Sequence, residues 1–367
     1  MKFTVKQSEF KRGLSIVSGA VANRTTMPIL YNILIVAQSN RLKLQATNLE
    51  IGLTAYVPAD VVEEGSLTLP SSTLIQLVGA MPSGNVEIST KGMTASLKCG
   101  LVKGNINGVD AEDFPVIPDG GYSDFSLDAD VVRKYIDYLS FCAESDNSRP
   151  VLKSLLFSIK DEVLMGAGAN GLNIAGEYTV NVPGAKDVTA LVPAKSFSEL
   201  GKIIGSEPVG VSISQNQAIF SLKDITLTSQ LMDGQYPDFS AMFSAVKPIK
   251  VRVSREELLS AIKAVNVFSQ DSSNAITLRA NFGEEDGVEV SARSAERGDA
   301  SPAIAATITG EDFEISTNGK SLQGVVSALK GEYVSITLED AKKPMIVTES
   351  ENSPIRYIVL PMFQGAR

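Results

Sequence analysis

The sequence predicts an α+β protein made of three tandem copies of one unit, in which two helices cover one face of an antiparallel sheet. Helix-type apolar stripes recur at a fixed spacing, and alternating strand patterns joined by short turns lie between them. A length of 367 residues suits two or three domains, and a hydrophobic content of 44% is ordinary for folded cores. We therefore expect three small domains rather than one large one.

An apolar stripe at positions i, i+4 and i+7 predicts the first helix of each unit. A second stripe, behind a lead-in that contains cap or early-turn residues, predicts the second helix. Each stripe recurs after 122 to 126 residues. The first-helix stripes are Phe10, Leu14, Val17; Val132, Ile136, Leu139; and Leu258, Ile262, Val265, and the second-helix stripes are Leu74, Leu77, Met81; Phe197, Leu200, Ile204; and Leu322, Val325, Leu329.

Strands and linkers repeat with the helices. Alternating patterns at 86–88, 209–213 and 334–338 follow the second helices and predict strands. A large apolar or aromatic residue stands before proline near the end of each unit, at Phe114-Pro115, Tyr236-Pro237 and Leu360-Pro361. All landmarks agree on a period near 124 residues, which indicates internal repetition. The expected domains are 1–121, 122–246 and 247–367, with linkers at 118–121 and 244–248.

Composition argues against several classes of protein. A net charge of -9 and a pI of about 4.9 disfavour a wholly basic DNA-coating protein, although the expected helices carry more basic than acidic side chains. The chain has no histidine, the commonest general base and metal ligand, so an enzyme becomes less expected. Its two cysteines have no C-x-x-C spacing, which disfavours a disulfide framework or a zinc site. We expect no catalytic residue, metal or cofactor.

The N-terminus carries no signal-peptide pattern. Met1–Gln7 contains no apolar h-region or cleavage site, and no stretch reaches the 18 or so apolar residues of a membrane span. We therefore expect a cytoplasmic protein without a membrane partner.

Six segments, in order and at matching spacing, resemble one known family. They are Met1–Val5, Arg24–Ile35, Ala46–Ile51, Ser145–Leu152, Asp233–Phe239 and Tyr357–Met362. Over essentially its full length, the chain resembles the bacterial DNA polymerase III beta subunit, a sliding clamp. The resemblance implies DNA-clamp (processivity fold) domains that form a ring, with the helices lining the inside and the sheets outside. It also implies a non-catalytic protein that encircles duplex DNA and tethers the replicative polymerase and other DNA-processing proteins.

The resemblance also implies partners. A head-to-tail homodimer would form the ring, and two chains of three units make a pseudo-sixfold assembly that closes without open edges. Duplex DNA would pass through it without regard to sequence, because contacts to phosphate carry no sequence information. Short peptides from the DNA polymerase III alpha subunit, the clamp loader and other proteins with clamp-binding motifs would compete for one groove per chain.

Site residues follow from the family match and from the basic helix faces. For DNA binding, Arg24 and Lys195 match family contact positions, and Arg133, Lys134 and Lys202 extend the basic surface. For the dimer interface, the candidates are Lys103, Ile106, Val267 and Phe268. For the partner-peptide groove, they are Leu152, Ala169, Gly171, Leu172, Asn173, Ile174, Pro237, Ala241, Met242, Val359, Leu360, Pro361 and Met362. An apolar groove with flexible methionines suits hydrophobic peptide anchors.

The chain departs from the family pattern at three places. The groove loop 168–174 lacks the aspartate, histidine and arginine that members often carry there. Phe363 and the tail 364–367 replace the usual arginine-containing ending. Ser72 stands where some members have a DNA-contacting arginine, so we expect weaker DNA electrostatics in the first domain.

Other interpretations have less support. Gly166–Gly171 matches the G-x-G-x-x-G dinucleotide fingerprint, but the residues after it read as a strand and not as the helix that binds pyrophosphate. A histidine-free enzyme with an active site between repeats would show turnover that depends on a buried carboxylate. A repeat scaffold without a DNA role would lack the interface residues and the basic helix face.

Overall fold

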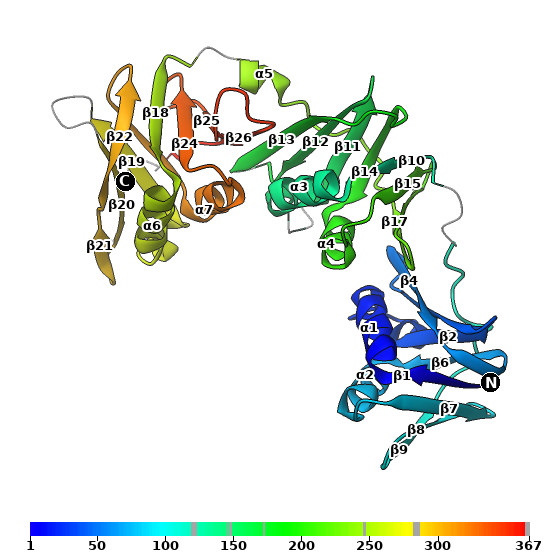
Figure 1. Cartoon of the computed structure of the whole chain (residues 1–367). Coiled ribbons are helices and arrows are strands. Elements are labelled where there is room, and N and C mark those ends of the chain that lie inside the picture. Colours follow the sequence, from blue (N-terminus) through cyan, green and yellow to red (C-terminus); the bar gives the residue numbers. More distant parts are fainter. Residues whose placement is uncertain are drawn as a thin grey trace. The chain divides into compact units, whose positions relative to one another are not determined.

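The computed structural model describes residues 1–118, 123–144, 146, 149–171, 173–244, 247–281 and 287–363 (Figure 1). The chain divides into two compact units, one made of 1–132 and 195–231 and the other of 133–194 and 232–367. The division therefore passes through the middle repeat, and each unit has its own sheets and core. The linkers expected at 118–121 and 244–248 lie partly outside the described residues.

All six helices expected from the apolar stripes are present, which confirms the repeat of two helices per unit. Within the described ranges the α-helices are α1 Gln7–Val17, α2 Ser71–Ala80, α3 Ala129–Leu139, α4 Ala194–Ile203, α5 Ser240–Ser244, α6 Arg255–Asn266 and α7 Gly319–Ala328. The short 3-10 helices are η1 Ser18–Ala20, η2 Pro28–Tyr31, η3 Ser140–Cys142, η4 Pro150–Lys153 and η5 Gln270–Ser272. The last residue of each second-helix stripe lies just beyond the helix end. The short α5 was not expected from the stripes.

The first unit contains two antiparallel sheets. The five-stranded sheet has the order β5-β1-β7-β8-β9, and the eight-stranded sheet has the order β10-β15-β16-β17-β4-β3-β2-β6. Their bounds are β1 Lys2–Lys6, β2 Asn32–Gln38, β3 Arg41–Thr47, β4 Ile51–Pro58, β5 Asp60–Glu63, β6 Gly65–Pro70, β7 Asn85–Lys91, β8 Thr94–Cys99, β9 Val102–Asn107, β10 Phe125–Leu127, β15 Val209–Ile213, β16 Gln217–Ser221 and β17 Ile225–Gln230. The pairing of β4 with β17 joins the first repeat to the second in one sheet.

The second unit contains one large antiparallel sheet. Its order is β14-β11-β12-β13-β26-β25-β24-β18-β22-β20-β19-β23, with β21 paired to β20. The bounds are β11 Ser154–Lys160, β12 Val163–Ala169, β13 Ile174–Asn181, β14 Val188–Pro193, β18 Ile249–Ser254, β19 Ala275–Asn281, β20 Gly287–Ser294, β21 Gly298–Ala300, β22 Ala303–Thr309, β23 Phe313–Asn318, β24 Tyr333–Leu338, β25 Met345–Thr348 and β26 Ile355–Val359. The pairing of β13 with β26 joins the second repeat to the third.

The helices lie close to the sheets because glycines remove side chains at the contacts. A Cβ atom on Gly13 of α1 would lie 2.6 Å from Val57 Cγ2, and one on Gly166 of β12 would lie 2.3 Å from Tyr135 Cε2 of α3. Gly166 opens the G-x-G-x-x-G pattern, and this pattern ends in a turn between β12 and β13. The first glycine therefore serves helix-on-sheet packing, and no helix follows the motif to bind a dinucleotide.

Candidate functional site

An apolar row crosses four neighbouring strands where the second and third repeats share their sheet. Ala169 of β12 faces Ala175 of β13, Ala175 faces Ile358 of β26, and Ile358 faces Ile346 of β25. All four residues are buried and belong to one hydrophobic cluster. Because side chains alternate between the faces of a strand, direct cross-strand partners share one face, and the row forms a continuous apolar strip.

Side chains from other segments pack against this row. Leu152 of η4 and Phe243 of α5 complete the buried cluster, and Tyr236, Phe239 and Leu360 pack against it while remaining partly accessible. The rings of Tyr236 and Phe239 contact each other edge to face, with centroids 6.4 Å apart. A row of aliphatic side chains bordered by aromatic rings is an apolar site with few polar groups, as suits a hydrophobic peptide.

Hydrogen bonds hold the described residues of the loop between β12 and β13. The side-chain oxygen of Asn170 accepts from the backbone N–H groups of Asn173 and Ile174, at 2.8 and 3.1 Å. Gly171 has a φ of +71°, a conformation that favours glycine, and its carbonyl accepts from Arg149 Nη1 at 3.1 Å. The Asn173 carbonyl accepts from Leu360 N–H at 2.8 Å, which ties the loop to the C-terminal segment.

An ion pair lies beside the row. Arg356 of β26 forms an ion pair with Glu177 of β13, and its guanidinium lies 4.5 Å from the centroid of the Phe243 ring. Burial raises the pKa of Tyr236 above its ordinary value of 10, so this phenol stays neutral at the edge of the row.

The predicted groove residues occupy different places in this arrangement. Leu152, Ala169 and Leu360 belong to the cluster or pack against it, whereas Pro237, Ala241 and Met242 are exposed beside it. Ile174 and Val359 are buried on the opposite face of the sheet, because each adjoins a residue of the row. Leu172 lies outside the described residues.

Several residues of this cluster were missed from the sequence. Ala175, Ile346 and Ile358 of the row, and Phe243, Tyr236 and Phe239 beside it, were not predicted as site residues. Tyr236 and Phe239 fall within the family-like segment Asp233–Phe239, so that segment was an available signal. The alternation of β13 and β26 could have favoured Ala175 and Ile358 over their neighbours, but only if the pairing of the two strands had been known.

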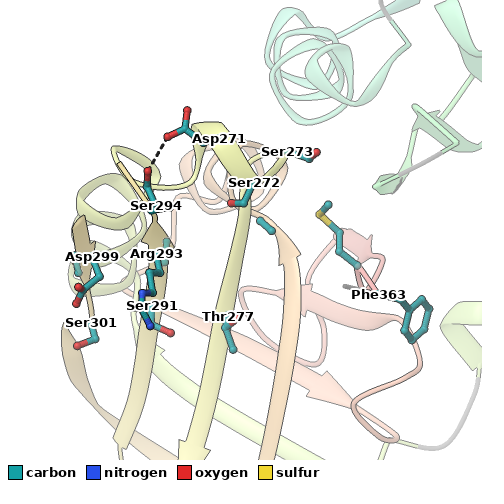
Figure 2. A pocket seen from close by; sticks show the side chains of 15 residues that line it. Asp271, Ser272, Ser273, Thr277, Ser291, Arg293, Ser294, Asp299, Ser301 and Phe363 are labelled. Atoms are coloured by element: carbon teal, nitrogen blue, oxygen red, sulfur yellow. Dashed lines mark hydrogen bonds between the residues drawn. The ribbon is translucent and has the colours of Figure 1, made fainter. Parts of the chain in front are cut away.

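A separate hollow of about 1280 Å³ lies on the third repeat and is mainly polar. Figure 2 shows side chains of β19, β20 and η5 around it, with Phe363 of the C-terminal segment across from them. Asp271 accepts a hydrogen bond from Ser294 Oγ at 2.7 Å, and it pairs with Arg297 at 3.5 Å. Met362, predicted for the groove, lines this hollow, and Pro361 forms an isolated bridge with Thr317. The hollow lacks an apolar row comparable to that between the second and third repeats.

Family comparisons identify the repeats. Three family models for the DNA polymerase III beta subunit match in succession: its N-terminal domain at residues 1–118, its central domain at 126–238 and its C-terminal domain at 243–363. The chain belongs to the DNA polymerase III beta subunit family. The resemblance seen in the sequence, the α+β fold and the three tandem clamp domains are thereby confirmed.

Known clamps resemble the chain over its whole length. The beta sliding clamp of Chlamydia muridarum is 27% identical over 367 residues, and that of Pseudomonas aeruginosa is 26% identical over 368 residues. Each comparison covers 99% of this chain and at least 99% of the relative. The crystal structure of the P. aeruginosa clamp bound to griselimycin has a TM-score of 0.91 at 25% identity, covering 99% of this chain and all of that one. The Bacillus subtilis clamp, at 24% identity, has the same fold with a TM-score of 0.93 and 99% coverage of both chains.

Family membership establishes the broad function. The chain is a DNA sliding clamp that confers processivity on a polymerase, and it is not an enzyme. Membership implies DNA and a polymerase as partners and a homodimeric ring. In the part of the chain that the structure describes, no helix has the length and apolar character needed to cross a membrane.

The predicted DNA-binding residues of this clamp lie on helices or beside them. Arg24, between η1 and η2, and Lys195, near the start of α4, are exposed. On α3, Lys134 is exposed and Arg133 is half-buried. Lys202 of α4 is exposed but pairs with Glu199 at 2.8 Å, which offsets part of its charge. Nine basic and six acidic side chains lie on the seven α-helices, so the basic excess is small.

Proposed function

We propose that two copies of this chain close head to tail around duplex DNA, with the helices toward the phosphates, and that the apolar row between the second and third repeats binds partner peptides. The repeated pairing of strands at the domain junctions is the observation that carries the proposal. At each junction inside the chain, the third strand after the first helix of one domain pairs with the last strand of the next domain. These pairs are β4 with β17 and β13 with β26.

One equivalent pair of strand edges is left over. In the third repeat, the strand that corresponds to β4 and β13 is β21, and it pairs only with β20 in the described structure. In the first repeat, the strand that corresponds to β17 and β26 is β9, which ends its sheet. An unpaired strand edge is a template for another chain, and a twofold operation satisfies both edges at once. We therefore assign β9 of one protomer to β21 of its partner.

Helix contacts at the junctions repeat in the same way as the strand pairs. At the first junction, Glu199 of α4 contacts the position of Gly19, where an added Cβ would lie 2.5 Å from its Oε2. At the second, Gly324 of α7 faces the Phe141 ring, with 2.9 Å from an added Cβ to Cδ2. When the first-helix stripes of the three repeats are aligned, Gly19, Phe141 and Val267 occupy equivalent positions. Val267 is 56% exposed. In the second helices, Gln76 of α2 occupies the position of Glu199 and Gly324. Gln76 of one protomer would therefore contact Val267 of its partner.

The interface residues predicted from the family fit this assignment to different degrees. Val267 is exposed. Phe268 is half-buried beside β21, and its ring lies 3.9 Å from an added Cβ on Gly298 of that strand. Lys103 is exposed on β9. Ile106 is only 4% exposed within its own domain, so we assign its contribution to the backbone edge of β9 and not to its side chain.

DNA contact by the helices would be weak and independent of sequence. Ser72 of α2, Lys195 of α4 and Lys320 of α7 occupy the same position in the three second helices, so the first repeat lacks the basic residue found in the other two. Contacts to phosphate give salt-dependent affinity without specifying bases, which allows a ring to slide. We propose Arg24 and Lys195 as the principal contacts, with Arg133 and Lys134 secondary.

We propose that the groove takes peptides from the DNA polymerase III alpha subunit, the clamp loader and other proteins with clamp-binding motifs. The missing charged residues of loop 168–174 leave an apolar row that suits hydrophobic anchors. We also propose domains of 1–121, 122–246 and 247–367, and a cytoplasmic location.

Retention on DNA tests the ring. The protein is loaded by a compatible clamp loader with ATP onto nicked circular plasmid, half of the sample is linearised, and bound protein is measured after gel filtration. We expect retention on circles and loss from linear DNA. Equal retention on both forms would contradict the ring, because it would indicate ordinary affinity.

The same assay tests the DNA-contacting residues. Arg24→Ala combined with Lys195→Ala should lower loading severalfold and reduce its salt dependence, because each side chain neutralises phosphate charge. Lys202→Ala is the matched control and should have a smaller effect, since Lys202 is already paired with Glu199. Unchanged loading of the double variant would refute these contacts.

A further inference from the structure

A charged pair lies directly beside the apolar row. Glu177 and Arg356 are cross-strand partners in the β13–β26 pairing, two residues along from Ala175 and Ile358. They therefore project from the same face of the sheet as the row. The Arg356 side chain is 41% exposed and the Glu177 side chain 15% exposed, so the carboxylate is largely covered.

Arg356 makes two contacts that use different parts of its guanidinium. Its Nη2 atom donates to Glu177 Oε1, while the guanidinium lies over the Phe243 ring. A planar guanidinium can stack on an aromatic ring and still donate from its edge, whereas a lysine ammonium lacks this planar fork. Arg356 therefore links the strand pairing to the buried ring.

Phe243 needs contacts from outside its own helix to keep its position. It belongs to α5, which has only five residues, and so short a helix is not stable by itself in water. Phe243 is 8% exposed and packs in the cluster with the row. Cluster packing and Arg356 together determine where the ring lies.

We propose that Glu177 and Arg356 are positioning residues for the partner-peptide groove. Glu177 orients Arg356, and Arg356 holds the Phe243 ring as one wall beside Ile358 and Ala175. Peptide affinity then depends on a charged pair that contributes no apolar surface to the row. This inference rests on the proposed peptide-binding function of the groove.

Peptide affinity tests the inference. The probe is a fluorescein-labelled peptide that carries the clamp-binding motif of the DNA polymerase III alpha subunit, titrated with full-length protein and followed by fluorescence polarisation. Arg356→Met and Glu177→Gln should each weaken binding about three- to tenfold, the range expected for loss of a partly buried cation–π contact. Arg356→Lys should recover only part of the loss, because it restores charge without planar stacking.

A second readout follows the position of the Phe243 side chain. The chain has no tryptophan, so Phe243→Trp introduces a single indole whose emission reports on this wall. In that background, Arg356→Met should shift the emission to longer wavelength, and Glu177→Gln should do so to a smaller extent. A general loss of stability would instead appear in thermal melts, which should change little.

The control is a second cross-strand Arg–Glu pair of similar geometry. Arg279 of β19 faces Glu314 of β23 at 2.6 Å, with side chains 51% and 55% exposed. Arg279→Met and Glu314→Gln should leave peptide affinity and indole emission unchanged. If the groove variants also bind like the unmodified protein, or if Arg356→Lys binds normally, the inference is wrong while the groove stands. If the unmodified protein fails to bind the peptide, both proposals fall.

Discussion

At the residue scale, buried tyrosines hold α3 to the sheet shared by the second and third repeats. Tyr357 of β26 donates its hydroxyl hydrogen to the Tyr138 carbonyl of α3 at 2.9 Å. Tyr135 of α3 donates to the Leu156 carbonyl at 2.7 Å. Tyr178 of β13 is 2% exposed, and its ring lies 5.5 Å from that of Tyr138. These phenols remain neutral because the buried site solvates a phenolate poorly.

Alkaline solution should therefore destabilise this unit. Desolvation, with a smaller contribution from Tyr138, raises the pKa of Tyr178 from 10.0 to about 12. The unfolded chain releases this proton near pH 10 and the folded chain does not, so the stabilisation is complete below pH 10 and is lost between pH 10 and about 12. Urea unfolding at stepped pH measures the effect, with Tyr178→Phe as the control. A loss that is equally steep in the Phe variant would contradict the assignment to Tyr178.

At the element scale, helix-on-sheet distance depends on glycines that face the helices. Gly166→Ala places a methyl group 2.3 Å from the Tyr135 ring, so we expect a destabilisation of about 1–3 kcal/mol from overpacking. Gly79 of α2 has nothing within 4 Å of an added Cβ, so Gly79→Ala should stabilise by roughly 0.5–1 kcal/mol. Denaturant unfolding compares the two. Equal changes in both would show that the α3–β12 contact tolerates a side chain.

At the scale of the whole molecule, ring closure should depend on the exposed apolar position after α6. Val267→Glu places a charge at the position of the proposed helix contact between protomers, and we expect the dimer dissociation constant to rise at least tenfold, because an unpaired buried charge is costly. Sedimentation velocity across a concentration series gives the result. Val62→Glu, at a 63% exposed valine on β5, is the control and should leave the dimer intact. A fully dimeric Val267→Glu protein would contradict the β9–β21 assignment.

The sequence by itself determined the repeat, the six helices and the family. Stripes such as Phe10, Leu14 and Val17 depend only on the helical period, which each segment carries locally, and all three are buried on one face of α1. The G-x-G-x-x-G motif could likewise be rejected locally, because the strand after it is visible in the sequence.

Only the tertiary structure decided which residues form the apolar row. Ala175 and Ile358 lie in different repeats and become neighbours through the β13–β26 pairing. Ile174 and Val359, the neighbours predicted from the family, pair with each other in the same register, but their side chains lie on the opposite face of the sheet. The register is set by the docking of one domain on the next, and the same docking brings Arg356 to Glu177 and Phe243. Local patterns specify which segments form strands, but which faces meet depends on contacts between residues far apart in the chain.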